Sequence, residues 1–352
     1  MMTLRLKHLM IMLAALLSLA SCEHDEPVNP IKPVSERTLL AIDMHGNIHD
    51  IEGNLIKTLP NCKVVTQIIV VDGDYFVSGV HSKDKVGYWK NGKWNTLHVD
   101  FIDDVDHWTY GIAKWDYNIY LLDYPNVLRN SGIFRLKDSE DFIPSSHGIS
   151  VSEGKCYVVG MDNIPLDDFN FECKPVLYTE RKGVYEKSYL PLPAGCNEGQ
   201  CHGIYAYDRT HYVAGGCAGS QAAIWEDGVV RTLPRLFDFV LPADNRGTIS
   251  MVDAVVKHGS HTYAAGVEYG EDHLPVAVFW VDDVPQKLVH STAKRIISNV
   301  GDMVLYGDDV YILTKESPMS TSTGDYEVTS VIWMNGEYLA SFTGEVTSIA
   351  VY

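Results

Sequence analysis

A short hairpin pattern recurs along this chain, and its spacing limits the fold more than any other feature. The stretch Tyr88–Leu97, YWKNGKWNTL, carries two tryptophan-containing runs around an Asn-Gly pair. Asn-Gly suits a two-residue type I′ turn, because both central residues of that turn need positive φ. The near-copies of this hairpin are Ala223–Leu233, Val278–Leu288 and Val331–Ser341, with weaker copies at Ile133–Ile143 and Leu177–Leu190.

The aromatic position of the hairpin returns every 44 to 55 residues. It is occupied by Trp89, Phe134, Tyr178, Trp225, Trp280 and Trp333. Two further strand-like segments precede each hairpin, so that each unit reads as four short strands, A to D. Four-stranded units at a period of about 40–50 residues are typical of a β-propeller. We interpret the tryptophan as a packing residue between blades.

The two ends of the repeat region predict the blade count. Thr343–Tyr352 reads as a strand A with no strand B after it, whereas Thr38–Pro60 reads as strands B, C and D with no strand A before them. The C-terminal strand would then complete the N-terminal blade and leave no open sheet edge. We therefore predict an all-β fold, a seven-bladed propeller in a single domain over residues 38–352. The alternative is six blades, if residues 38–60 pack outside the ring.

The first 37 residues predict an export signal and a tether. A basic start is followed by an apolar run over Leu9–Leu19, which is long enough for a signal-peptide core but too short to span a bilayer. Leu19-Ala20-Ser21-Cys22 resembles a bacterial lipobox, which implies cleavage after residue 21 and lipidation of Cys22. Residues 22–37 would form an extended, proline-containing tether. The alternative is an ordinary cleaved signal with an incidental cysteine.

An acidic cluster follows the predicted lipidation site. Glu23, His24, Asp25 and Glu26 resemble the surface-export signal of lipoproteins in Bacteroidetes-type bacteria. This resemblance implies a lipid-anchored protein of the bacterial outer membrane that is exposed on the cell surface. The formal net charge of −18 opposes binding to nucleic acid, which depends on basic contacts to phosphate.

The repeats resemble the kelch-like class of propellers, with glycine closing strand B and tryptophan on strand C. Only Gly215-Gly216 has the double glycine of kelch repeats. The repeats are more similar to those of propeller-like lipoproteins of gut Bacteroidetes, which carry a Trp-x-Asn-Gly hairpin. This resemblance covers nearly the whole mature chain, and it implies a fold and a location but no activity.

Residues just before the core of each strand A are candidates for a site at the mouth of the central channel. One aligned column contains Thr66, Tyr110, His147, His202, Val252, Gly301 and Thr347, and the next contains Gln67, Gly111, Gly148, Gly203, Asp253, Asp302 and Ser348. The candidate binding residues in these columns are His147, His202, Asp253 and Asp302, with Gln67 and Tyr110. Such a cluster is suited to hold a cation or to perform acid–base chemistry. The alternative is a wet channel mouth whose polar residues bind nothing.

Two long connections on the same face add aromatic candidates. A connection between strands B and C over Asp162–Glu172 contains Phe169 and Phe171, and a connection between strands D and A over Arg235–Gly247 contains Phe237 and Phe239. Exposed aromatic residues suit sugar stacking or protein contacts. The alternative is that these residues only pack the loops against the ring.

Six cysteines remain after Cys22, and in an exported chain they allow three disulfides. Cys156 and Cys173 are candidates for one bridge within a blade, and Cys196 or Cys201 is a candidate partner of Cys217. The alternative for Cys196–His202, CNEGQCH, is part of a metal site, but no second cysteine pair supports it, so a disulfide or buried thiols are favoured. No motif predicts a cofactor or a known catalytic machinery.

These observations favour a membrane-anchored binding module that presents one propeller face to a glycan or to an envelope protein. The first alternative is a glycan lyase or hydrolase acting at the channel mouth, and the second is a structural component of an envelope complex. Whether the protein is an enzyme stays open, with binding favoured.

Overall fold

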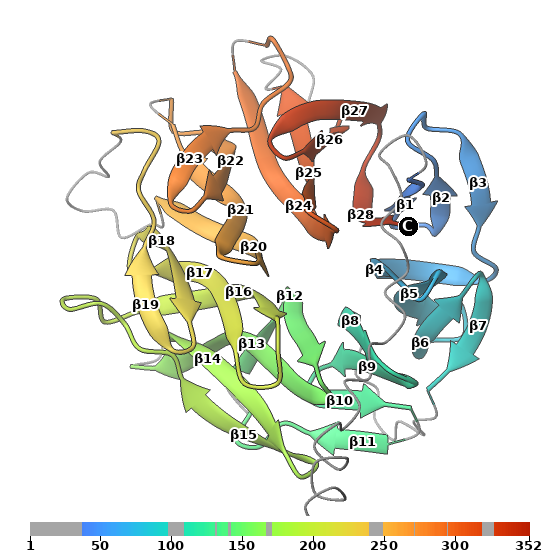
Figure 1. The fold of residues 1–352 in the computed structure, drawn as a ribbon, viewed down its shortest axis with the longest axis horizontal. Coiled ribbons are helices and arrows are strands. Elements are labelled where there is room, and N and C mark those ends of the chain that lie inside the picture. The colour runs from blue at the N-terminus through green and yellow to red at the C-terminus, as the bar shows by residue number, and fades with distance from the viewer. Residues whose placement is uncertain are drawn as a thin grey trace, which may run out of the picture. The chain divides into compact units, whose positions relative to one another are not determined.

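The computed structural model describes residues 37–97, 109–130, 132–139, 142–166, 171–238, 249–270, 272–293, 295–318 and 327–352. Of residues 146 and 147 it describes the backbone only. Residues 37–352 form one compact unit in which all the regular structure described is β-strand. The strands are arranged as seven four-stranded blades around a central axis, so this part of the chain is a seven-bladed β-propeller (Figure 1). The described residues include no helix that is long and apolar enough to cross a membrane.

The blades are numbered from the N-terminus, and their strands are given in the order A to D. Blade 1 consists of β28 (Val346–Val351), β1 (Leu39–Asp43), β2 (Asn47–His49) and β3 (Leu55–Thr58). Blade 2 consists of β4 (Cys62–Val71), β5 (Asp74–His81), β6 (Lys85–Lys90) and β7 (Lys93–Thr96). Blade 3 consists of β8 (Thr109–Trp115), β9 (Asn118–Asp123), β10 (Asn126–Arg129) and β11 (Gly132–Arg135).

The remaining four blades follow the same order. Blade 4 consists of β12 (Phe142–Ser152), β13 (Lys155–Pro165), β14 (Phe171–Arg181) and β15 (Val184–Tyr189). Blade 5 consists of β16 (Gly199–Ala206), β17 (Tyr212–Ala218), β18 (Gln221–Glu226) and β19 (Val229–Thr232). Blade 6 consists of β20 (Ser250–His258), β21 (His261–Tyr269), β22 (Pro275–Val281) and β23 (Val284–Lys287). Blade 7 consists of β24 (Ile296–Tyr306), β25 (Asp309–Pro318), β26 (Thr329–Met334) and β27 (Glu337–Thr343).

The ring closes within blade 1, as the two ends of the sequence predict. Strand β28 pairs antiparallel with β1, with Leu39 opposite Val351 and Ala41 opposite Ile349 (Figure 1). Ile349 and Ala41 are fully buried, so this pairing joins the two ends of the chain through core residues. The prediction of seven blades is confirmed, and the alternative of six is wrong.

The recurring Asn-Gly and Asp-Gly pairs fix the turn between strands C and D. Asn91 and Gly92 have φ values of 51° and 82°, which is the left-handed conformation that a type I′ turn requires. The side chain of Asn91 also accepts a hydrogen bond from the backbone N–H of Tyr75, at 3.0 Å. The same bond joins Asp227 to Tyr212, Asp282 to Thr262 and Asn335 to Val310. The turn residue thus ties the C–D hairpin to the start of strand B.

The tryptophan of the hairpin packs between blades, in agreement with the interpretation from sequence. Trp89, Trp225 and Trp280 are at most 1% exposed. The indole N–H of each donates to a proline carbonyl in the connection from the preceding blade, to Pro60 at 3.2 Å, Pro191 at 2.6 Å and Pro234 at 2.9 Å. The hairpin therefore recurs because it builds the joint between neighbouring blades.

Two expectations about individual blades are wrong. In blade 3 the structure places Phe134 on strand D (β11) rather than strand C, because the C–D turn lies at Asn130, whose side chain accepts the N–H of Ile119 at 3.1 Å. In blade 4 most of the connection expected at 162–172 is strand. The β13–β14 ladder continues to Pro165 opposite Phe171, which forms a long hairpin.

Candidate binding face

Connections B–C and D–A leave the blades on one face of the ring, here called the D–A face, and the A–B and C–D turns lie on the other, the A–B face. Every strand A is interrupted by a register shift between the two faces. At equivalent places in the seven strands the skipped residues are Thr66, Tyr110, residues 145–148, His202, Asp253, Gly301 and Thr347, and β4 has a second shift at Lys63. A bulged residue leaves the ladder and turns its side chain to a new direction. We call these residues the bulge ring.

The bulge ring surrounds a cavity in the central channel. This upper cavity has a volume of about 260 Å³. It is lined by Thr66, Ser145, His202, Asp253, Val300, Gly301, Lys315 and Thr347. Six of the seven blades contribute to it, and most of the side chains are polar. The sequence alignment of strand A therefore predicted the ring, but in blade 6 it was wrong by one residue, since the bulge is Asp253 and not Val252.

Several polar groups around the upper cavity bind one another. The Thr66 hydroxyl lies 2.6 Å from that of Thr109 and 2.8 Å from that of Ser78. The Lys315 amine pairs with Glu345 at 2.7 Å. The ring of His202 lies 3.2 Å from the side-chain oxygen of Gln200. These contacts hold the side chains in place and leave His202 and Asp253 half-buried on the cavity wall.

His202 and Asp253 come from neighbouring blades that approach closely. A Cβ placed on Gly203 would lie 2.8 Å from the carbonyl oxygen of Asp253, so only glycine fits beside strand β20. His147 forms a backbone bridge to Gly203 on the other side, and its ring lies outside the described side chains. Tyr110 is half-buried against the core between blades 3 and 4 and does not line the upper cavity.

Asp302 and Gln67 do not line the upper cavity, and each binds the next blade. Asp302 is 1% exposed, and its carboxylate accepts from the Ser348 hydroxyl and, at 3.1 Å, from the N–H of Ile349 in the next blade. Gln67 accepts from the N–H of Ile112 in the next blade at 2.9 Å. Both residues follow the bulge by one position, so they join adjacent inner strands rather than face the upper cavity.

Two of the four aromatic candidates, Phe171 and Phe237, lie among the described residues, and they belong to different blades and connections. Phe171 begins β14 and is 55% exposed, whereas Phe237 is half-buried in the D–A connection before blade 6. The N–H of Phe237 donates to Glu268 at 3.0 Å, which fixes the start of that connection. Phe169 and Phe239 lie outside the described residues.

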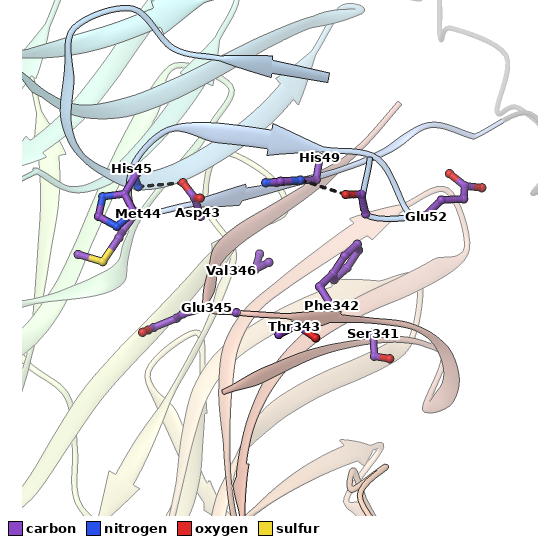
Figure 2. Close-up of a pocket in the computed structure, with 12 residues that line it drawn as sticks. Asp43, Met44, His45, His49, Glu52, Ser341, Phe342, Thr343, Glu345 and Val346 are labelled. Carbon is purple, nitrogen blue, oxygen red and sulfur yellow. Dashed lines mark hydrogen bonds between the residues drawn. The ribbon is translucent and has the colours of Figure 1, made fainter. Parts of the chain in front are cut away.

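A second hollow on the ring lies at the seam between blades 7 and 1. This seam groove has a volume of about 380 Å³, and its walls include Asp43, His45, His49, Glu52, Phe342 and Glu345 (Figure 2). Phe342 comes from β27 and contacts Gly53, where a Cβ would lie 3.3 Å from the ring. The Asp43 carboxylate stabilises the turn that follows it, because it accepts hydrogen bonds from the N–H groups of His45 and Asn47, both at 2.9 Å.

Residues that the sequence reasoning missed hold the D–A connections in place. Glu268 and Glu316 occupy the same position near the end of strand B and are at most 1% exposed. Glu268 accepts from the N–H of Leu236 at 2.8 Å, and Glu316 accepts from that of Ser291 at 2.8 Å. The sequence contains a signal for this role. An acidic residue follows the glycine or threonine of strand B by two positions, in Gly266-Val267-Glu268 and in Thr314-Lys315-Glu316.

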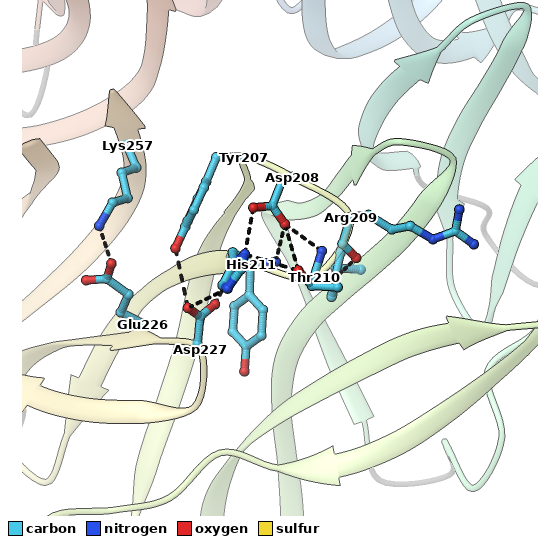
Figure 3. A network of polar contacts seen from close by, with 10 residues as sticks. Tyr207, Asp208, Arg209, Thr210, His211, Glu226, Asp227 and Lys257 are labelled. Carbon is cyan, nitrogen blue, oxygen red and sulfur yellow. Dashed lines mark hydrogen bonds and ion pairs between the residues drawn. The ribbon is translucent and has the colours of Figure 1, made fainter. Parts of the chain in front are cut away.

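A second missed group lies on the A–B face of blades 5 and 6. The ring of His211 lies 2.6 Å from Asp208 and stacks on Tyr207 (Figure 3). Asp208 accepts backbone N–H groups of Thr210 and His211, and these bonds lower its pKa to about 2. The hydrogen bond to Asp208 raises the pKa of His211. The group fixes the A–B turn of blade 5, and the histidines beside this turn in blades 5 and 6 were its signal.

None of the six described cysteines forms a disulfide. Cys173 lies opposite Asn163, seven residues from Cys156 along β13, or roughly 23 Å at strand spacing. These two residues are too far apart for a disulfide. Cys201 packs in the core between blades 4 and 5 beside Ala218, while Cys217 precedes Ala218 and points to the opposite face of β17. Neither expected disulfide forms, and Cys196 does not bridge to Cys217 either. The described residues also include no cluster of three or more histidine, cysteine or acidic residues arranged for a metal ion.

No family model and no curated protein matches the sequence. Solved structures with similar architecture include AztD from Citrobacter koseri, with a TM-score of 0.45 and 10% identity over 90% of this chain and 98% of that chain. They also include a putative TolB from Agrobacterium tumefaciens, with a TM-score of 0.39 and 9% identity over 87% of both chains. A subtype N11 neuraminidase-like protein of A/flat-faced bat/Peru has a TM-score of 0.45 and 12% identity over 81% of this chain and 92% of that chain. Similarity at this level transfers no function to this chain.

Proposed function

We propose that this protein is a lipid-anchored binding module of the bacterial outer membrane, exposed on the cell surface, which binds a glycan or an envelope protein with its D–A face. The observation that supports the binding face is the bulge ring. Six blades direct residues to one cavity, and its half-buried wall carries an imidazole, a carboxylate, an amine and hydroxyl groups. A rigid ring that presents convergent polar groups in a concavity is the usual form of a binding site.

The seam groove begins beside this face and continues between blades 7 and 1 to the C–D turn at Glu52. Glu345 lines the groove, and its partner Lys315 lines the upper cavity, so the ion pair of 2.7 Å marks the boundary between the two hollows. A ligand larger than one sugar ring can therefore contact both. Catalysis has less support, because Asp302 is held between blades and does not join His202 and Asp253 at the cavity.

The first test is a search for the ligand with the intact mature protein. We expect the protein to bind a defined set of glycans on an array of bacterial and host polysaccharides, or to capture one envelope protein after cross-linking on cells. The control is a Ser145→Cys variant that carries a bulky label on this cysteine, so that the label masks the D–A face. The other thiols of the variant are blocked before labelling. Absence of both binding and capture by the unmasked protein contradicts the proposal.

The second test concerns the anchor, which rests on the sequence pattern alone. Cys22→Ala should release the protein from the membrane fraction or leave its leader uncleaved, whereas Ser21→Ala should keep both processing and membrane association. Lipidation can be followed by metabolic labelling with a fatty-acid analogue. A Cys22→Ala variant that is processed and fractionates like the unaltered protein contradicts the lipid anchor, and protection from protease on intact cells contradicts surface exposure.

A further inference from the structure

The central channel changes its chemistry below the bulge ring. A second cavity of about 230 Å³ lies along the same inner strands, toward the A–B face. Its wall begins one or two residues after the bulges, at Gln67, Ile204 and Ala254. The upper cavity ends at Thr66, His202 and Asp253 on those same strands. The two cavities are therefore consecutive levels of one channel.

The lower cavity is lined mainly by aliphatic side chains. Its wall takes such side chains from six blades, and they include Ile69, Ile112, Val151, Ile204, Val256 and Met303. Ile69 and Val151 are only half-buried, so they keep apolar surface toward the channel. Contact between water and apolar surface is unfavourable. An apolar ligand group that replaces this water is therefore bound with a gain in stability.

The charged end of the lower cavity is already neutralised. Lys114 lines the cavity near the A–B face, and its amine pairs with Asp72 at 2.6 Å. The Lys114 side chain is 11% exposed. Because Lys114 is already paired with Asp72, a ligand needs no anionic group at the lower end of the channel. The aliphatic wall then determines which ligand group fits there.

We propose that the channel binds an amphipathic small molecule of the alkyl glycoside or glycolipid class, with its sugar at the bulge ring and its unbranched alkyl chain in the lower cavity. The inference rests on the proposed function, from which it takes the D–A face as the binding face. Hydroxyl, imidazole and carboxylate groups at the ring match a sugar head. The aliphatic level below matches a chain and excludes a second sugar, whose hydroxyls would lose their water without new partners.

A chain-length series of n-alkyl β-glucosides, from methyl to decyl, tests this inference. Binding to the intact mature protein is measured by calorimetry below each critical micelle concentration, with free glucose as the reference. The affinity should rise by about threefold to fourfold for each added methylene. It should reach a plateau when the lower cavity is full. Equal affinity across the series, or no binding by any member, overturns the inference.

Two channel variants make the test specific. Val151→Lys places a charge on the aliphatic wall and should abolish the dependence on chain length, whereas Val284→Lys, at a residue of β23 that is 68% exposed, should keep it. Ala113→Leu narrows the lower cavity and should move the plateau to shorter chains. Melting temperatures confirm that each variant is folded. A plateau that none of the folded channel variants moves overturns the inference, while the proposed function fails only if the ligand search also fails.

Discussion

At the scale of single residues, one buried carboxyl group is unlike its counterparts in the other blades. Asp123 ends strand β9 at the position that glycine occupies in blades 2, 4, 5 and 6, and it is 0% exposed. Burial raises the pKa of Asp123 to about 7. The folded protein therefore binds a proton at Asp123 more tightly than the unfolded chain does, and this makes the stability depend on pH.

The sign of that dependence follows from proton linkage. Between pH of about 4 and 7 the folded protein holds a proton on Asp123 that the unfolded chain has lost, so the free energy of unfolding falls as pH rises. The total loss is about 4 kcal/mol, reached near pH 7 and constant above it. We expect Asp123→Asn to match the unaltered protein at pH 4 and to exceed its stability at pH 8, as measured by urea unfolding.

A second buried acid provides the control for this prediction. Asp162 accepts from the Tyr189 hydroxyl at 2.8 Å and pairs with Lys187 at 2.5 Å. Asp162→Asn should therefore lose about 1–3 kcal/mol at pH 8, where Asp123→Asn gains stability. If Asp123→Asn shows the same slope with pH as the unaltered protein, the pKa of Asp123 is not raised and the argument is wrong.

At the scale of secondary-structure elements, the hairpin between strands C and D combines two separable effects. The Asn91 side chain binds the N–H of Tyr75, and its backbone adopts a φ of 51°. Asn91→Gly removes the hydrogen bond but suits the positive φ, and should cost about 0.5–1.5 kcal/mol. Asn91→Ala also forces alanine into the left-handed region, which should cost about 1–2 kcal/mol more. Equal stability of the two variants in urea would show that the turn conformation makes no contribution of its own.

The elements also show what the sequence could predict. The hairpins that contain Trp-x-Asn or Trp-x-Asp were found correctly, because their turn chemistry and their buried aromatic residue are both local signals. Blade 3 was assigned wrongly, since Leu128 stands where the other blades have an aromatic residue and Phe134 imitates it nearby. The hairpin of β13 and β14 was taken for a loop, because Pro165 and several acidic residues conceal the alternation of a strand.

At the scale of the whole molecule, the closing strand should be essential for stability. Val346, Ile349 and Val351 of β28 are at most 5% exposed, and burial of each side chain contributes about 1.5–3 kcal/mol. Deletion of residues 345–352 should therefore lower the melting temperature by at least about 10 °C or make the protein insoluble. A synthetic peptide of residues 344–352 should restore the melting temperature when added in excess. A soluble truncation that melts like the full chain would show that β28 is not needed to close the ring.

The ring and its blade number were accessible from the sequence because both depend on a repeated pattern and on the two incomplete ends. The candidate site was accessible only in part. The alignment found the bulge position in most strands, but it could not separate Asp253, which lines the upper cavity, from Asp302, which joins two blades. That difference depends on a shift of one residue in a strand ladder, which no local signal in the sequence records.

The central claim, that the upper cavity on the D–A face binds the ligand, is tested most directly by two matched double variants. His202→Ala/Asp253→Asn alters the cavity wall. His258→Ala/Asp308→Asn alters an exposed pair of 2.8 Å on the A–B face. The measurement is the affinity of both folded variants for the glycan or envelope protein that the unaltered protein captures. We predict a loss of at least about tenfold for the cavity variant, as expected for about 1.4 kcal/mol of lost contacts, and a change within about twofold for the control. Unchanged affinity of the folded cavity variant would contradict the claim.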